Sequence, residues 1–429
     1  MPFPDEKTVQ LDHLEIYSPG QTLTLTPHKP PNPWGWRLYP LPKDLTHEAT
    51  ELSEEGKKLT RLEMVFKHSQ PHRLDPDIQK IESNKMKVRI LDIIRNDTRG
   101  PYTPGTQKLK CEVLQVPSDT PSNNNHQVPA VGEVIFLKVY DPMFFPRNVS
   151  EIDAQWKVTA RADMALSNEV GAYGLLHQHS LTGSPNIAPQ WLGCWTTEVE
   201  TTDDAYKGRT RHVAVVALEY IDGVCLQKLL YTDESGELSY IGDHSRVGSD
   251  VAELRAMGTE ARLGVMEDLL ANISRQYRAG VNKYAMIPKN VIVSFRRGTE
   301  AFERPRVSLV DYEQHYIGPF RDPPHNRWAR LEKPVHPWYR WGYKRLELFF
   351  RCRWFPSDWE VVDGNCHRLE QWLVGTFGPL GGNDEYSPSF EADLSQAEKE
   401  ALLDASRKFK AEKEAASAKP TGVGEAGTL

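Results

Sequence analysis

The side chains of this sequence that could do chemistry are charged or amide groups set within or just after apolar runs. Lys138 interrupts the strongly β-prone run VIFLKVYD, Glu169 lies beside an apolar stripe in SNEVGAYGLL, Asn290 stands in MIPKNVIV, and Asp311 ends the strand-like VSLVD. Taken alone, Lys138 is typical of an outward-facing charge on an edge strand. Asp311 alone is typical of a turn that follows a strand.

Other familiar motifs are weak or missing. His177 and His179 are two positions apart at the end of an expected helix, so they point to different faces, which favours solvated histidines over a metal site. Cys366 and His367 have no matching pair elsewhere, which favours a structural role. No GxSxG or HExxH motif occurs in the sequence, so the commonest hydrolase signals are absent.

Apolar patterns predict the elements that must position these residues. Strands are expected at 87–96, 108–116 and 134–141, with a nearly continuous apolar strand at 212–224 that should be central in its sheet. A helix is expected at 167–180, where the apolar residues follow one stripe.

The strongest helical pattern comes later in the chain. Its apolar residues recur at steps of three and four: Leu263, Met266, Leu270, Ile273 and Tyr277. Gly280 stands where the residue after a helix end belongs. The polar segment 231–257 is expected to be irregular, 285–295 to be a loop and a strand, and 306–314 a strand. Six tryptophans between 327 and 372 indicate a helical core.

Both ends of the chain differ from the middle in composition. Residues 26–44 are dense in proline and tryptophan, which favours an extended arm. This arm could dock into an aromatic-lined groove of a partner protein, but we favour packing along the chain's own domain with Trp34 and Trp36 as anchors. Residues 395–417 are rich in Glu, Lys and Ala after a capping box, and predict a charged helix before a disordered end.

Composition excludes several functional classes. The 429 residues contain 52 Lys and Arg against 59 Asp and Glu, a net charge of −7, which argues against a nucleic-acid partner. No long apolar run or signal peptide is present, so no membrane association is expected. The five cysteines are scattered without CxxC spacing, which predicts neither a disulfide framework nor a zinc site. These features predict a protein of the cytoplasm or nucleus.

The order of these elements resembles the protein-kinase-like superfamily, which includes protein kinases and aminoglycoside- and choline-type phosphotransferases. The sequence has these elements in order: a hairpin, a strand with a lysine, a helix with a glutamate, a strand ending in EYIDG, a long helix, a loop with an asparagine and a strand ending in aspartate. The resemblance implies an α+β, bilobal fold, with a small β-rich N-lobe that has one key helix and a larger, mainly helical C-lobe. The expected divisions are 1–85 as an irregular Pro/Trp-rich arm, 86–221 as the N-lobe, 222–390 as the C-lobe and 391–429 as a charged tail.

The resemblance also implies roles for individual residues, with ATP and Mg²⁺ as ligands. Lys138 looks like the strand lysine that reaches the α- and β-phosphates, and Glu169 like the helix glutamate that pairs with it. The backbone at Glu219 and Ile221 would bind the adenine edge. The two magnesium ligands would be Asn290 and Asp311, because their side chains supply the oxygens that Mg²⁺ prefers.

Departures from the family pattern limit the expected activity. Aligning HRDxxxxN to end at Asn290 puts Ala285 at the position of the catalytic aspartate, so the resemblance assigns no catalytic residue. General-base catalysis is typically worth about 10² to 10⁴ in rate. The hairpin loop 95–105 lacks GxGxxG and offers fewer backbone amides to phosphate, and Asp311 is followed by Tyr-Glu instead of Phe-Gly.

The preferred functional hypothesis is a pseudokinase-like binding or regulatory protein that binds ATP and magnesium without efficient phosphoryl transfer. The alternative is a divergent ATP-dependent phosphotransferase for a small-molecule hydroxyl or amine, with its base supplied elsewhere, for instance by Glu313. In a third hypothesis the fold is a structural relic with a filled pocket, and the retained residues are ordinary ion pairs.

Overall fold

The chain folds into a mixed α/β structure with two compact units. The computed structural model describes these residues: 14–35, 39–46, 50–69, 71, 74–94, 105–118, 127–145, 156–201, 203–232, 238–241, 249–282, 286–322, 324, 326–388, 400, 404, 407 and 411. The first unit consists of Met1–Cys225, Gly280–Ala285 and Asn290–His325, and the second of Leu226–Ala279, Met286–Lys289 and Asn326–Leu429. Each unit therefore contains several separate stretches of the chain, whereas the expected lobe boundary at 221/222 makes each lobe one continuous stretch.

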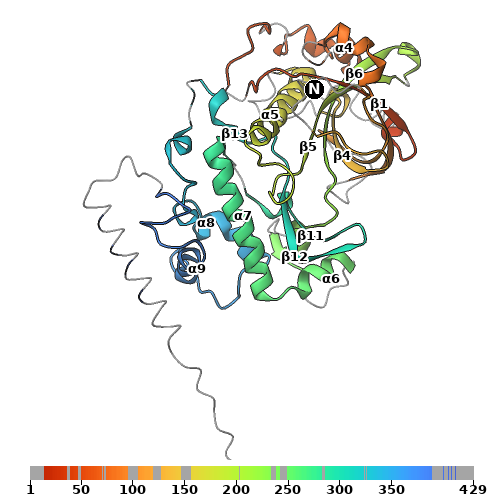
Figure 1. Cartoon of the computed structure of the whole chain (residues 1–429). Helices are drawn as coiled ribbons and strands as arrows, with labels where there is room; N and C mark the ends of the chain where they lie inside the picture. The colour runs from red at the N-terminus through yellow and green to blue at the C-terminus, as the bar shows by residue number, and fades with distance from the viewer. Residues whose placement is uncertain are drawn as a thin grey trace, which may run out of the picture. The chain divides into compact units, whose positions relative to one another are not determined.

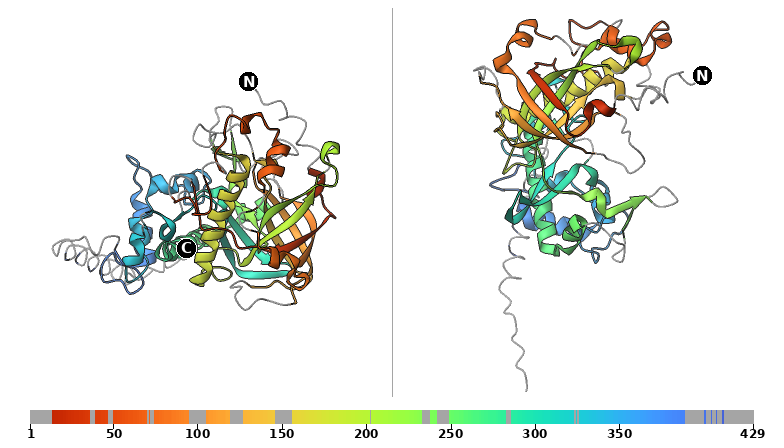
Figure 2. Two further views of the ribbon diagram at one scale, coloured as in Figure 1. Left: turned by 90° about the horizontal axis from the view of Figure 1, so that it is seen from above. Right: turned by 90° about the vertical axis from the view of Figure 1, so that its right-hand side faces the viewer.

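A closed antiparallel barrel forms the core of the first unit (Figures 1 and 2). Its strands are β1 (Thr22–Pro27), β2 (Met86–Ile93), β3 (Gln107–Gln115), β4 (Val134–Tyr140), β5 (Trp191–Glu200) and β6 (Thr210–Glu219). They lie in the order β1-β2-β3-β4-β6-β5, and pairing of β1 with β5 closes the barrel. Alternate side chains fill its interior, as in β3, where Leu109, Cys111 and Val113 are fully buried.

Strand β1 corrects the expectation that residues 1–85 are irregular. Leucine and threonine alternate in TLTLTP, and Leu23 and Leu25 point into the barrel core. The helices α3 (Arg61–His68) and α4 (Pro76–Lys80) also belong to this segment. The flanking prolines conceal the short alternation in the sequence, because proline-rich composition by itself predicts extended, unpaired backbone.

The long helix α5 (Val158–Gln178) packs against β4, β5 and β6. It begins nine residues before the expected range of 167–180, because residues 158–166 include three alanines, a methionine and a leucine, which favour helix. Tyr173 on this helix lies between two other aromatic rings, with centroid distances of 5.6 Å to Trp191 of β5 and 5.0 Å to Tyr312. This stack fixes α5 relative to both the barrel and the segment that contains Tyr312.

The proline- and tryptophan-rich arm packs on α5, which confirms Trp34 as an anchor. Trp34 is fully buried, and its ring contacts Trp156 edge-to-face at 6.2 Å in a cluster with Ala160 and Met164. Gly35 has φ +80°, and a Cβ there would lie 2.1 Å from the Met164 sulfur, so only glycine allows this approach. The other proposed anchor, Trp36, lies outside the described residues.

Smaller strands complete the first unit. They are β7 (Val224–Cys225), β10 (Val281–Asn282), β11 (Val291–Arg297), β12 (Glu300–Leu309) and β13 (Tyr316–Ile317). β11 and β12 form a hairpin that β7 extends, and β10 pairs with β13. β11 and β12 confirm the strands that the sequence predicts after Pro288 and before Asp311.

The second unit is mainly helical. It contains α6 (Ser249–Ala256), α7 (Thr259–Ala279), α8 (Tyr343–Arg351) and α9 (His367–Phe377), with short strands β8 (Leu230–Thr232) and β9 (Leu238–Tyr240). The predicted long helix is α7, with Gly280 at φ +99° directly after it. Tyr277 stacks on Trp328 and Trp341, so tryptophans do form this core. The expectation of an irregular segment at 231–257 was wrong for α6.

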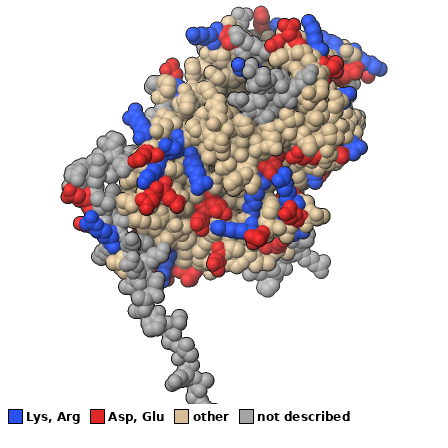
Figure 3. Space-filling view, viewed as in Figure 1, with Lys and Arg blue, Asp and Glu red and all other residues tan. Residues whose placement is uncertain are grey.

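Other features bear on the general expectations for the chain. Among the described residues, no helix combines the length and the apolar character needed to cross a membrane. The five cysteines are free thiols, four of them buried. Lys and Arg side chains are interspersed with Asp and Glu on the face shown in Figure 3. The predicted tail helix at 395–417 lies almost wholly outside the described residues.

The burial of Trp34 predicts that the arm is part of the folded core. We expect Trp34→Ala to lower the free energy of unfolding by about 3–5 kcal/mol, because it leaves a large cavity against α5. Val131→Ala, at a side chain that is 63% exposed, should change it by less than about 0.5 kcal/mol. Urea denaturation of both variants measures the difference, and equal effects would contradict the anchoring role.

Candidate functional site

Lys138 lies in the middle of β4, on the outer face of the barrel. Its neighbours Leu137 and Val139 fill the barrel interior, so the strand pleat directs Lys138 the other way. β4 pairs with β3 on one side and β6 on the other, so Lys138 is not on an edge strand. Its side chain is only 3% exposed. A lysine this deeply buried requires charged partners.

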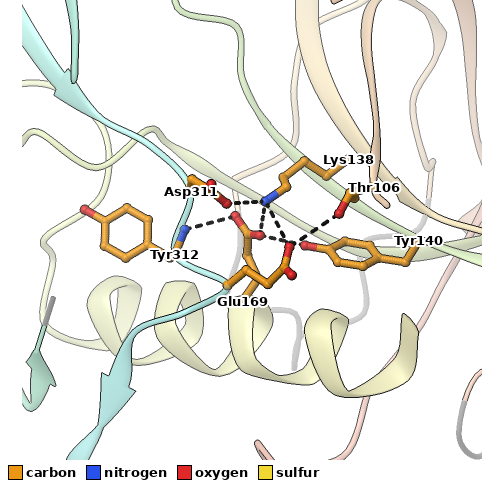
Figure 4. Close-up of polar contacts among 7 residues, drawn as sticks. Thr106, Lys138, Tyr140, Glu169, Asp311 and Tyr312 are labelled. Atoms are coloured by element: carbon orange, nitrogen blue, oxygen red, sulfur yellow. Dashed lines mark hydrogen bonds and ion pairs between the residues drawn. The ribbon is translucent and has the colours of Figure 1, made fainter. Parts of the chain in front are cut away.

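Glu169 on α5 is the first of those partners (Figure 4). Its carboxylate is fully buried and accepts a hydrogen bond from the Lys138 ammonium, 31 positions away in sequence. The Tyr140 hydroxyl donates to the same oxygen at 2.6 Å, and the Tyr312 backbone N–H donates to the other at 3.4 Å. Both oxygens of Glu169 therefore have partners, which fixes the orientation of the carboxylate.

Asp311 and Glu313 add two further carboxylates. Lys138 Nζ lies 3.1 Å from Asp311 Oδ1 and 3.9 Å from Glu313 Oε2. Asp311 follows β12 with φ +67°, a left-handed conformation that is uncommon outside glycine and often found at functional sites. The Thr106 hydroxyl donates to Glu313 at 3.3 Å. Three residues predicted from separate motifs, Lys138, Glu169 and Asp311, therefore meet in one cluster.

Charge is unbalanced in this cluster. One oxygen from each of Glu169, Asp311 and Glu313 lies within 4.8 Å of the others. Burial alone would lower the pKa of Lys138, but the three carboxylates outweigh it and raise the pKa above its ordinary value. Burial, together with the neighbouring carboxylates, raises the pKa of Glu313 to about 7 in spite of Lys138. Lys108 also interacts with these carboxylates, but two ammonium groups do not compensate three carboxylates.

The cluster fits a divalent cation by its donor chemistry. Asp311 is 33% exposed, and Glu313 lies beside it, so two carboxylate oxygens face a common space. The predicted second ligand, Asn290, is nearby along the backbone, because its carbonyl accepts a 2.9 Å hydrogen bond from the N–H of Val310. Sequence reasoning gave Glu313 no metal role, although its position two residues after Asp311 was the available signal.

Glu219 has a different environment from the one expected. It ends β6, and its backbone N–H already donates to Gln190 at 3.0 Å. Its carboxylate forms a two-point ion pair with Arg306, at 2.5 and 2.9 Å. Burial alone would raise the pKa of Glu219, but Arg306 holds it below the ordinary value. Glu219 and Ile221 line a cavity of about 350 Å³, and their predicted contacts to adenine stay a prediction.

Ala285 and the neighbouring residues 283–284 lie outside the described residues, as does the hairpin loop at 95–104. The assignment of Ala285 to the catalytic-aspartate position therefore rests on the sequence.

The raised pKa of Glu313 predicts a pH-dependent stability. Its carboxyl rises from an ordinary pKa of 4.5 to about 7, so the folded chain holds this proton more tightly than the unfolded chain. The proton on Glu313 therefore stabilises the folded chain. This contribution is fully present below the pKa of Glu313 in the unfolded chain and is lost as the pH rises through its pKa in the folded chain. We therefore expect the free energy of unfolding to fall between about pH 5 and about pH 8.

Glu313→Gln should remove most of this fall, because an amide does not titrate. Glu303→Gln, at an exposed position of β12, should keep it. Urea denaturation across this pH range measures both variants, and a Glu313→Gln profile parallel to the wild type would contradict the assignment.

Comparison with known proteins gives likenesses to solved structures at low sequence identity. No protein-family model matches the chain, and no curated protein matches it. Among solved structures, a complex of WaaP with acyl carrier protein is 14% identical, with 75% of this chain and 88% of that chain covered and a TM-score of 0.30. A structure of the Rad53 kinase domain with SCD2 is 11% identical, covers 53% and 51%, and has a TM-score of 0.26. Rad53 1-466 in complex with AMP-PNP is 12% identical, covers 52% and 38%, and has a TM-score of 0.28.

Proposed function

We propose that this chain is a protein-kinase-like binding protein of the pseudokinase type, which binds ATP with Mg²⁺ but does not transfer the phosphoryl group efficiently. The observation that carries the proposal is the contact of one buried ammonium, Lys138, with both Glu169 and Asp311. These residues come from β4, α5 and the segment after β12, in the order that the motifs predict. A coincidental ion pair would not require all three.

The cluster has the chemistry of a phosphate and metal site. Glu169 keeps Lys138 charged and oriented, so that its ammonium is available to an anion on the side of Asp311. Asp311 and Glu313 would hold the metal ion, with Asn290 as a further oxygen ligand from the adjoining backbone. A bound magnesium ion would offset carboxylate charge and that of the phosphates.

The same chain lacks the group that a kinase uses as its base. Ala285 has a methyl side chain at that position and cannot accept the proton of a substrate hydroxyl. The proposed function is therefore binding, with nucleotide as a ligand that stabilises the fold. In this proposal the barrel, α5 and the β11–β12 hairpin, all in the first unit, supply the nucleotide contacts.

The binding proposal is tested by thermal and urea denaturation with Mg-ATP. A ligand at about 100 times its dissociation constant stabilises the folded state by about 2.7 kcal/mol. We expect stabilisation of this kind for the wild type and for Lys87→Ala, whose side chain is exposed on β2. Asp311→Ala should lose it, because the metal ligand is gone. A wild type unaffected by millimolar Mg-ATP would refute nucleotide binding.

One observation favours a second candidate function, a divergent phosphotransferase for a small hydroxyl or amine substrate. Glu313 has a pKa of about 7 and lies in the same cluster as Asp311. A carboxyl with a pKa near the working pH is suited to accept a proton. Glu313 could then replace the missing aspartate as general base.

Slow ATP turnover distinguishes the two functions. If Ala285 limits the chemistry, Ala285→Asp should raise turnover by about 10² to 10⁴, which is the usual contribution of a general base. Glu313→Gln should then lower turnover by the Ala285→Asp variant only by weakening metal binding, so a higher Mg²⁺ concentration should restore it. Turnover that Ala285→Asp leaves unchanged, and that both Asp311→Ala and Glu313→Gln abolish even at saturating Mg²⁺, would instead identify a phosphotransferase.

A further inference from the structure

Two lysines on β3 share the outer barrel face with Lys138. Lys108 and Lys110 alternate with the interior residues Leu109 and Cys111, so both point outward. Lys108 pairs in register with Lys138 on β4, and Lys110 pairs with Phe136, two positions further along. Directly opposite residues of an antiparallel pair lie side by side on one face. A row of cations therefore runs from the carboxylate cluster along β3.

Lys108 is a partly buried cation that forms no ion pair within the described part of the chain. Burial and the adjacent charge of Lys138 lower its pKa, which the carboxylates of Asp311, Glu169 and Glu313 only partly offset. Like charges directly opposite each other on two strands are destabilising. A phosphate group between Lys108 and Lys138 would remove this repulsion, because it would interact favourably with both ammonium groups.

Lys110 connects this row to the cavity beside Glu219. Its ammonium lies 4.5 Å from the ring centroid of Tyr220, and both residues line the cavity of about 350 Å³. Phe302 adds a second aromatic ring to the lining. The carboxylate-bearing Glu219 and the cationic Arg306 also line it. The cavity therefore offers aromatic surface beside charged side chains, which suits a heteroaromatic ring.

We propose that Lys108 and Lys110 bind the phosphate chain of a nucleotide whose base occupies the cavity beside Tyr220. This inference rests on the proposed function and specifies how the ligand is held. Two residues along a strand span about 6.6–6.8 Å, so Lys110 contacts the phosphate next to the ribose and Lys108 the terminal phosphates near Lys138. Side-chain ammonium groups thus bind the phosphates in place of the backbone amides of a glycine-rich loop. The loop at 95–105 lacks the GxGxxG motif that supplies such amides.

The test measures dissociation constants of the full chain by calorimetry for four probes: Mg-ATP, Mg-ADP, AMP and adenosine. Lys108→Met keeps the apolar stem and removes the charge, and Lys87→Met makes the same change on the outer face of β2, opposite Gln115. We expect Lys108→Met to weaken Mg-ATP binding about 10- to 100-fold. The loss should be smaller for Mg-ADP and absent for AMP and adenosine, because the single phosphate of AMP contacts Lys110 and not Lys108. Lys87→Met should bind all four probes as the wild type does.

The outcomes separate this inference from the proposed function. A wild type that binds none of the probes overturns both. A wild type that binds Mg-ATP, together with a Lys108→Met variant that binds it equally well, overturns only the role of Lys108. Equal weakening of adenosine and Mg-ATP in Lys108→Met would also overturn it, since that pattern reports a disturbed fold. Lys108→Arg, which keeps the charge, should restore most of the Mg-ATP affinity.

Discussion

The buried ammonium of Lys138 is the interaction on which the rest of the first unit depends. Removing a charge from water costs several kcal/mol unless partners replace the lost hydration. Its partners come from α5 and from the segment after β12, so the cluster forms only when three distant parts of the chain are in place. The left-handed backbone at Asp311 is part of the same constraint, because it directs the carboxylate toward Lys138.

The position of α5 is therefore as important as the residues it contains. Trp34 packs against the helix, and Tyr173 stacks on Trp191 and contacts the tilted ring of Tyr312. At Gly171 an added Cβ would lie 2.3 Å from Pro33, so the arm approaches the helix backbone itself. Because β1 of the same N-terminal segment closes the barrel, the arm holds both the barrel and the helix. Rigid elements of this kind are what a precise binding site requires.

Local patterns in the sequence predict most of the barrel strands and the long helix α7, and the resemblance to protein kinases implies that Lys138, Glu169 and Asp311 converge. They do not reveal β1, because six alternating residues among prolines give a weak signal, nor α6, because its polar composition resembles a loop. Long-range side-chain partners also escape a local pattern. Arg306 is 87 positions from Glu219, and the closeness of Lys108 to Lys138 follows only from the β3–β4 register.

The charges of the site select among possible ligands. Three carboxylates surround one ammonium, so the cluster around Asp311 and Glu313 favours an added cation. Lys108, on the neighbouring strand, has no ion pair in the described chain and favours an added anion. A metal ion alone would leave the repulsion between Lys108 and Lys138, and an anion alone would approach the excess carboxylates. In the proposed function a metal ion bound to a phosphate chain would interact favourably with the carboxylates and with Lys108 at the same time. The charges therefore favour a metal–phosphate complex over either component alone.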